Sequence, residues 1–200
     1  MSEREIDQQL VERAQQGDQA AFALLVAKYQ RKVARILTNL LPDVAEIDDV
    51  TQLAFIKAYR SLPSFRGDSA FYTWLYRVAV NAGKNYIVQQ ARRGRTRSLA
   101  QNTVHEGAES EERLRDNQTP ELILLSKQIG LTVDAALEAL PAELRIAITL
   151  REIEGLSYEE IAVVMDCPLG TVRSRIHRAR EAIAVKLKPL VDTPLDKRHG

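Results

Sequence analysis

Residues 155–187 constrain the fold most, because this stretch predicts two helices joined by a tight turn. Ser157 and Glu160 stand three positions apart before an apolar run, which is the pattern of a capping box at a helix start. The segment Asp166-Cys167-Pro168 predicts an interruption, since aspartate tolerates the left-handed conformation that such turns often need. A second helix is expected from Pro168 or Leu169, because proline is well accepted in a first helical turn.

The second helix of this pair has two unlike faces. One is an apolar stripe at spacings of three or four residues, formed by Val172, Ile176, Ala179, Ile183 and Leu187. The opposite face is polar and largely basic, with Thr171, Ser174, His177, Arg178 and Glu181, flanked by Arg173 and Arg175. A helix anchored on one face and presenting arginines on the other can read the major groove of DNA. A surface helix with a solvated basic face would look similar, but the short helix and aspartate turn before it favour a helix-turn-helix.

The bulk composition excludes several classes of protein. Lys and Arg number 28 against 27 Asp and Glu, so DNA binding would depend on a local basic patch rather than on net charge. Cys167 is the only cysteine, which excludes an intrachain disulfide and predicts a cytosolic compartment. The start, MSEREIDQQL, lacks the apolar run of a signal peptide, and no apolar stretch predicts direct membrane insertion. No metal-ligand spacing and no glycine-rich phosphate loop is present, so no catalytic residue, metal or cofactor is expected, and the chain is not predicted to be an enzyme.

The apolar periodicity predicts an all-α fold, because no segment alternates long enough to suggest a sheet. We expect two small helical domains joined by a flexible linker, the second ending in the helix-turn-helix at about residues 156–187. The proposed boundaries are 1–95 for the first domain, 96–120 for the linker, 121–191 for the second domain and 192–200 for a disordered tail. In the first domain, helices are expected at residues 6–14, at about 19–41, from about 48 and from 71. Pro189 is expected to lie beyond the last helix.

Two stretches of the first domain carry unusual side chains. The helix expected from residue 48 has more apolar residues than one narrow stripe holds, so part of its surface is available for a partner, or the helix is buried on two sides. The helix expected from residue 71 carries Trp74, Arg77, Asn81 and Lys84 at spacings of three and four, and Arg92, Arg93 and Arg95 follow. Stacking combined with positive charge suits single-stranded nucleic acid. The alternative is that Trp74 belongs to the core and the cations are solvated.

Three segments together resemble the extracytoplasmic-function sigma factors, and among them the sigma-E-like group. These segments are DDVTQLAFIKAYRSL, SFRGDSAFYTWLYRVAVN and LPAELRIAITLREIEGLSYEEIAVVMDCPLGTVRSRIHRAREAI. The resemblance implies a two-domain initiation subunit of bacterial RNA polymerase in an envelope or extracytoplasmic stress response. Its implied partners are the polymerase core (clamp and flap), promoter DNA and a membrane-bound anti-sigma factor, which would hold a cytoplasmic protein at the inner membrane.

The resemblance also implies roles for individual residues. Polymerase-core binding would fall to Asp49, Gln52, Leu53, Phe55, Ile56, Ala58 and Tyr59. Binding of the minus-ten element would fall to Phe65, Arg66, Ser69, Trp74, Arg77, Asn81 and Lys84. Binding of the minus-thirty-five element would fall to Thr171, Arg173, Ser174, Arg175, His177 and Arg178. Two positions depart from the family pattern: Leu53 stands where an acid is usual, and His177 stands where sigma-E-like proteins often carry phenylalanine.

Two other classes of protein would account for part of the sequence. A helix-turn-helix repressor or activator would bind duplex DNA as a dimer, but it would leave the aromatic and basic helix from residue 71 without a role. A nucleic-acid-modifying enzyme would need a catalytic constellation, which the sequence does not offer.

Overall fold

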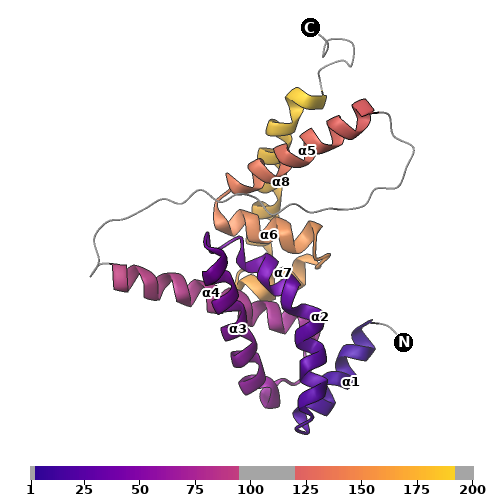
Figure 1. The fold of residues 1–200 in the computed structure, drawn as a ribbon, viewed down its shortest axis with the longest axis vertical. Helices are drawn as coiled ribbons and strands as arrows, with labels where there is room; N and C mark the ends of the chain where they lie inside the picture. The colour runs from indigo at the N-terminus through magenta and orange to yellow at the C-terminus, as the bar shows by residue number, and fades with distance from the viewer. Residues whose placement is uncertain (1–2, 95–119, 192–200) are drawn as a thin grey trace.

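The computed structural model describes residues 3–94 and 120–191, and every element in these two ranges is helical (Figure 1). The first range holds α1 (Glu3–Gln15), α2 (Gln19–Leu37), α3 (Val44–Ser61), the short 3₁₀ helix η1 (Leu62–Ser64) and α4 (Phe71–Gly94). The second range holds α5 (Pro120–Glu138), α6 (Ala142–Glu152), α7 (Tyr158–Met165) and α8 (Leu169–Val191). The prediction of an all-α fold with two helical domains is confirmed. Apart from Pro120, the predicted linker and tail lie outside the described residues.

The α3 helix begins one turn earlier than the sequence suggested. Its first residue is Val44 rather than a residue near Asp48, because Asp43 caps it by accepting a hydrogen bond from the backbone N–H of Ala45 at 2.7 Å. Asp48 and Asp49 therefore lie inside the helix, where their carboxylates do not serve as the cap.

The end of α2 also differs from the prediction. The helix ends at Leu37, not near Leu41, because the chain turns at Thr38, whose backbone N–H bonds to the carbonyls of Ala34 and Ile36. The apolar periodicity predicts Leu40 on the inner side of this helix, but Leu40 is only half-buried, whereas Leu41, 3% exposed, is buried. The periodicity therefore overestimated the length of the helix and missed which of the two leucines is buried after the turn.

The predicted helix-turn-helix is confirmed in detail. The hydroxyl of Ser157 accepts from the Glu160 N–H at 3.1 Å, and the Glu160 carboxylate accepts from the Ser157 N–H at 2.8 Å, which completes the capping box. Asp166 adopts the left-handed conformation, with φ 53° and ψ 55°. The second helix, α8, then starts at Leu169. It packs along α5, α6 and α7 through its apolar stripe.

The α8 helix continues to Val191, past the predicted end at Leu187, and so includes Pro189. This expectation was wrong, although Pro189 has no backbone N–H to bond to the carbonyl four residues earlier. Packing against α5 and α6 holds the helix beyond the point where the local sequence favours a stop.

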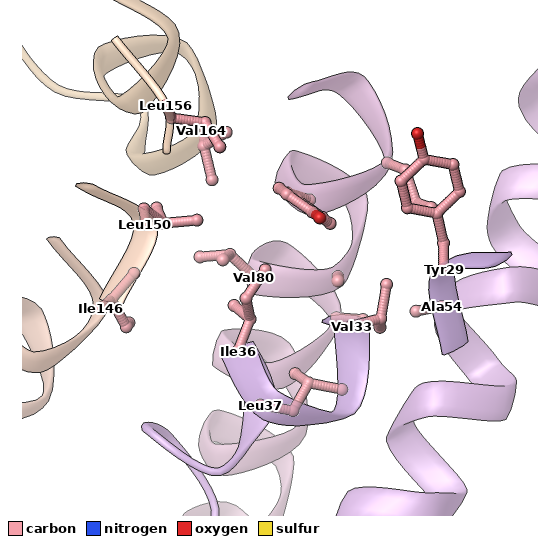
Figure 2. Close-up of a cluster of buried hydrophobic side chains, with 14 of the residues drawn as sticks. Tyr29, Val33, Ile36, Leu37, Ala54, Val80, Ile146, Leu150, Leu156 and Val164 are labelled. Atoms are coloured by element: carbon pink, nitrogen blue, oxygen red, sulfur yellow. The ribbon is translucent and has the colours of Figure 1, made fainter. Parts of the chain in front are cut away.

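The helices of the two domains share a buried cluster of apolar side chains. Figure 2 shows Ile36 and Val80 of the first domain facing Ile146 and Leu150 of the second. The α4 helix lies between the domains, since α3 packs on one of its sides and α7 on another. The apolar periodicity of α4 predicts a core stripe formed by Phe71, Leu75, Val78, Ala79, Ala82 and Tyr86. Val78 and Tyr86 are only half-buried and the other four are buried, whereas Val80, 0% exposed, was not predicted to be buried.

Candidate nucleic-acid and polymerase-binding surfaces

The surface of α3 exposes apolar side chains, as its excess of apolar residues suggested. Leu53, Ile56 and Tyr59 are 38%, 49% and 41% exposed. Asp49 and Gln52, on the same helix, are also exposed. In contrast, two other predicted contact residues are buried: Phe55 is 7% exposed and Ala58 is 0% exposed. The helix is therefore buried on one broad side and open on another.

An apolar groove of about 490 Å³ lies between α2 and α3. Its lining residues are Gln19, Phe22, Ala23, Val26, Phe55, Ile56, Tyr59 and Arg60. The rings of Phe22 and Tyr59 meet edge to face, with centroids 4.9 Å apart. We name this groove and the exposed side of α3 the α2–α3 surface. The apolar periodicity of residues 19–41 predicts Phe22 and Val26 on the inner side of their helix, so these α2 residues were missed as surface residues.

The loop between η1 and α4 is fixed by an aromatic cluster. Phe65 is 9% exposed and packs against Phe71 and Trp74, with ring centroids 6.1 and 5.0 Å apart. The side-chain amide of Gln15 donates to the carbonyls of Leu62 and Phe65, each at 2.9 Å. This contact between α1 and the loop was not predicted, because glutamine at an exposed helix position carries no specific signal.

The basic and aromatic face of α4 is present next to this loop. Arg77 and Asn81 are exposed, whereas Trp74 and Lys84 are half-buried. Trp74 packs against the core and still has an accessible part, so it can belong to the core and also remain available to stack on a base. In the loop itself, Arg66 is exposed and Ser69 is half-buried.

The polar face of α8 carries most of the predicted groove-reading residues. Arg173, Ser174, His177 and Arg178 are exposed, and Thr171 is half-buried.

Arg175 differs from the other arginines of this face. It is half-buried, donates to the Cys167 sulfur at 3.3 Å and forms an ion pair with Glu143. Because it already has two partners, it is less free to contact a base than Arg173 or Arg178.

Polar groups cross from one domain to the other where α4 meets α7. The Tyr72 hydroxyl donates to Glu160 at 2.5 Å, and the Thr73 hydroxyl donates to the same carboxylate oxygen at 3.3 Å. The Tyr76 hydroxyl donates to Glu154 at 3.0 Å. We call these five residues the domain seam.

The seam perturbs the pKa of several of its groups. Burial alone would raise the pKa of Glu160, but hydrogen bonds from Tyr72 and from the Ser157 backbone lower it overall below the usual 4.5. Burial and the adjacent Glu154 carboxylate raise the pKa of Tyr76, and burial and Glu160 raise that of Tyr72. All three groups therefore keep their complementary protonation states, tyrosine neutral and glutamate charged, near neutral pH.

The described residues contain neither a metal site nor a membrane-spanning helix. Within the two described ranges, no group of three or more His, Cys, Asp or Glu side chains could hold a metal ion. No helix in this part of the chain combines the length and the apolar character needed to cross a membrane.

Comparison with known proteins relates these surfaces to a family. Residues 25–93 match the family model for Sigma-70 region 2, and residues 131–183 match that for Sigma-70, region 4. The chain is 56% identical to the ECF RNA polymerase sigma-E factor of Escherichia coli K12, an alignment that covers 96% of this chain and 99% of that protein. It is 53% identical to the RNA polymerase sigma-H factor of Pseudomonas aeruginosa, over 96% of this chain and 98% of that protein.

Two solved structures share the fold. One is CnrH in complex with the cytosolic domain of CnrY, with a TM-score of 0.62, 26% identity and coverage of 94% of this chain and 99% of that one. The other is the sigma factor RpoE in complex with the anti-sigma factor NepR from Bartonella quintana, with a TM-score of 0.60, 25% identity and coverage of 86% and 98%. The 56% identity to a sigma-E factor extends over almost the full chain, and the matches to Sigma-70 regions 2 and 4 follow one another along the sequence. The protein therefore belongs to the extracytoplasmic-function sigma factors.

Proposed function

We propose that this chain is an alternative sigma factor, which binds bacterial core RNA polymerase and directs initiation at specific promoters. The observation that carries the proposal is the 56% identity to a sigma-E factor over 96% of the chain. The exposed apolar side chains of α3 and the exposed arginines of α8 support it. Such a protein acts by binding, so it needs no catalytic residue and no cofactor.

The two domains are assigned different parts of polymerase and promoter binding. Residues 1–95 are assigned to core binding and to the minus-ten element, and residues 121–191 to the minus-thirty-five element and the polymerase flap. The Bartonella quintana sigma factor RpoE, solved in complex with the anti-sigma factor NepR, supports an anti-sigma partner here as well. The partner we propose lies in the inner membrane and holds there a protein that otherwise resides in the cytoplasm. The envelope stress response is the proposed setting for this regulation.

The α2–α3 surface is the proposed docking site for the polymerase clamp. Ile56 and Tyr59 offer apolar area that is exposed in the free chain, and association would remove it from water. Phe55 lines the groove, and the small side chain of the buried Ala58 lets the neighbouring helices pack closely. Asp49 and Gln52 supply polar groups for the rim of the contact.

Opening of the minus-ten element is assigned to the loop and the exposed face of α4. The sequence contains no nucleotide-binding loop, so strand separation has to come from tighter binding of the open state than of the closed one. Trp74 can stack on an unpaired base, Arg77 and Lys84 can neutralise the backbone, and Asn81 can bond a base edge. The aromatic cluster of Phe65, Phe71 and Trp74 would hold the Trp74 ring in place for this stacking.

Replacing Ile56 by glutamate tests the docking site. Ile56 is 49% exposed, so the fold should tolerate the change, while a carboxylate would lose its water on binding. Loss of one large apolar contact, about 1.5–3 kcal/mol, predicts at least a tenfold rise in the dissociation constant for core polymerase. The measurement is a titration of labelled protein with purified core.

Leu24→Glu is the matched control, because Leu24 is 55% exposed on α2 but does not line the groove. Its affinity for core should equal that of the wild type. Equal affinity of the Ile56 and Leu24 variants for core polymerase would show that the α2–α3 surface is not the docking site. Run-off transcription with purified core polymerase on a promoter library tests the function itself. A measurement of particle size with and without core polymerase tests the alternative, because a stable dimer that does not bind core would indicate a repressor.

A further inference from the structure

The helix α1 contains none of the residues proposed to touch polymerase or promoter, yet it contacts the loop that carries some of them. It lies along α2 and buries Val11 and Ala14 in the first domain (Figure 1). Its last residue, Gln15, is exposed, but the Gln15 side chain reaches the segment between α3 and α4. We name residues 65–70 of this segment the minus-ten loop. A contact with this loop allows α1 to influence promoter recognition without touching DNA.

The side-chain amide of Gln15 bonds to two backbone carbonyls at the start of this loop. Its nitrogen lies 2.9 Å from the carbonyl oxygen of Leu62 and 2.9 Å from that of Phe65. An amide NH₂ group has two hydrogens, so one nitrogen can serve both acceptors. The Leu62 carbonyl also accepts from the Phe65 N–H at 3.0 Å, which closes the turn of η1. Gln15 therefore joins the last turn before the loop to the first residue of the loop.

The first half of α1 is anchored to the aromatic cluster behind the same loop. Asp7 is 3% exposed, and its carboxylate accepts from the Lys28 ammonium at 2.7 Å and from the Tyr29 hydroxyl. A buried carboxylate paired in this way resists displacement, because loss of a partner leaves a charge unsatisfied. The Tyr29 ring packs edge to face on Phe71, with centroids 5.8 Å apart. Because α1 is held in both halves, its last residue is kept at a fixed place beside the loop.

The bond to the Phe65 carbonyl also orients the residue that follows. A peptide unit is planar, so a fixed Phe65 carbonyl fixes the direction in which the chain enters Arg66. Arg66 is exposed and is assigned to the minus-ten element. Beyond it, Gly67 has φ 77°, and a Cβ atom at this glycine would meet nothing within 4 Å. The tip of the loop thus turns in open space, and its position depends on its two ends, Phe65 and the buried Ala70.

We propose that Gln15 is a positioning residue for recognition of the minus-ten element, which acts by fixing the start of the minus-ten loop. This inference rests on the proposed function. The two hydrogen bonds keep the loop in the conformation in which Arg66 and Ser69 meet an unpaired base. Without them the loop samples other conformations, and the apparent affinity for the correct base falls with the competent fraction. Two neutral hydrogen bonds correspond to about a tenfold change in such a fraction.

The test replaces Gln15 by leucine in the full chain, which removes the donor from the carbonyls of Leu62 and Phe65. The variant is assembled with core polymerase and bound to premelted fragments of a promoter recovered by run-off transcription, each with one minus-ten base changed. Discrimination should fall about tenfold, and the loss should be concentrated at a single position. The reason is that a loop able to repack accepts a wrong base more readily. Affinity for core polymerase should stay at the wild-type value.

Trp74 provides a second readout in the free protein, without polymerase or promoter. It is the only tryptophan of the chain, and its ring centroid lies 5.0 Å from that of Phe65. Loss of the Gln15 bond to Phe65 should loosen the packing of the two rings. The constant for quenching of Trp74 fluorescence by acrylamide should therefore rise in the Gln15→Leu variant.

Gln16→Leu is the matched control. Gln16 is the next residue and is exposed, and its side chain forms no hydrogen bond with the residues that the structure describes. The change should leave discrimination and quenching at wild-type values. Gln15→Lys tests rescue, because an ammonium group again supplies donors for both carbonyls. It should restore discrimination, while its added charge raises the affinity for all sequences alike. Circular dichroism of all variants shows whether the helices are retained.

Three results would overturn the inference. Wild-type discrimination by the folded Gln15→Leu variant would show that Gln15 does not position the loop for recognition. An equal loss of affinity for every minus-ten sequence, or the same loss in Gln16→Leu, would indicate a general effect on the fold. Failure of Gln15→Lys to restore discrimination would show that the hydrogen bonds are not the cause. A failure of the proposed function is distinguishable, because the wild-type chain would then give no run-off transcription, while quenching of Trp74 still reports the state of the loop.

Discussion

Replacing Arg173 and Arg178 together by alanine is expected to reduce specific binding of the minus-thirty-five element by at least about thirtyfold. Both arginines are exposed on the polar face of α8, and the opposite face of that helix is anchored in the core. An arginine that bonds a guanine through two hydrogen bonds gives about 1–3 kcal/mol of discrimination, so two such contacts together reach this magnitude. The measurement is holoenzyme binding to the cognate element and to a scrambled one.

Arg180→Ala provides the control for loss of charge. Arg180 lies on the same helix but faces α6, where it forms an ion pair with Glu152 at 2.5 Å. Its removal should leave discrimination between the two elements unchanged. If the double variant lost affinity equally for both elements and showed a shallower salt dependence, its arginines would contact phosphates and would not read bases. Arg175→Ala should have the smaller effect, since Arg175 is held by Cys167 and Glu143.

Asn81→Ala is expected to lower initiation at a duplex promoter at least tenfold. Asn81 is exposed on α4 beside Trp74 and Arg77, so the change should not disturb the core. The reason for the loss is that unpairing a base costs a few kcal/mol, and a bond to the flipped base would offset part of this cost. Initiation rates are to be compared on a duplex promoter and on one whose minus-ten segment is already mismatched.

Premelting should restore part of the Asn81→Ala activity, but not all of it, because the bond to the base remains absent. Wild-type activity of the variant on duplex DNA would refute the assignment. No rescue at all by the mismatch would mean that Asn81 recognises the base without assisting its release from the DNA duplex. Phe65→Ala is a poorer probe, since Phe65 is buried among Phe71 and Trp74 and its removal would cost about 3–5 kcal/mol of folding free energy.

The helix-turn-helix could be predicted closely because its determinants are local. The capping box spans four residues, and the turn depends on one residue, Asp166, in a left-handed conformation. The start of α3 was predicted less well, because Asp43 and the acids at 48 and 49 are all plausible caps and only the backbone geometry distinguishes them. Apolar periodicity likewise left open whether α3 keeps an apolar side exposed or is buried on two sides, and it did not locate the end of α2.

Features that depend on contacts between distant helices could not be predicted. The groove requires knowledge of how α2 packs on α3, and the sequence alone assigned Phe22 to the inner side. The burial of Tyr76 and Val80 requires knowledge that a second domain covers that side of α4. A periodic pattern shows which residues share a helix face, but a helix with apolar residues on several faces does not reveal which face meets which neighbour.

The shared apolar cluster has a consequence for the lifetime of the protein. Leu150 and Leu156 of the second domain lie with Ile36 and Val80 in one buried cluster (Figure 2). If the two domains separate to bind the two promoter elements proposed for them, these side chains meet water unless another macromolecule covers them, and exposed apolar surface promotes aggregation and proteolysis. We therefore expect molecules that open without a polymerase or an inhibitor at hand to be degraded first, so that the amount of the protein follows the supply of its partners.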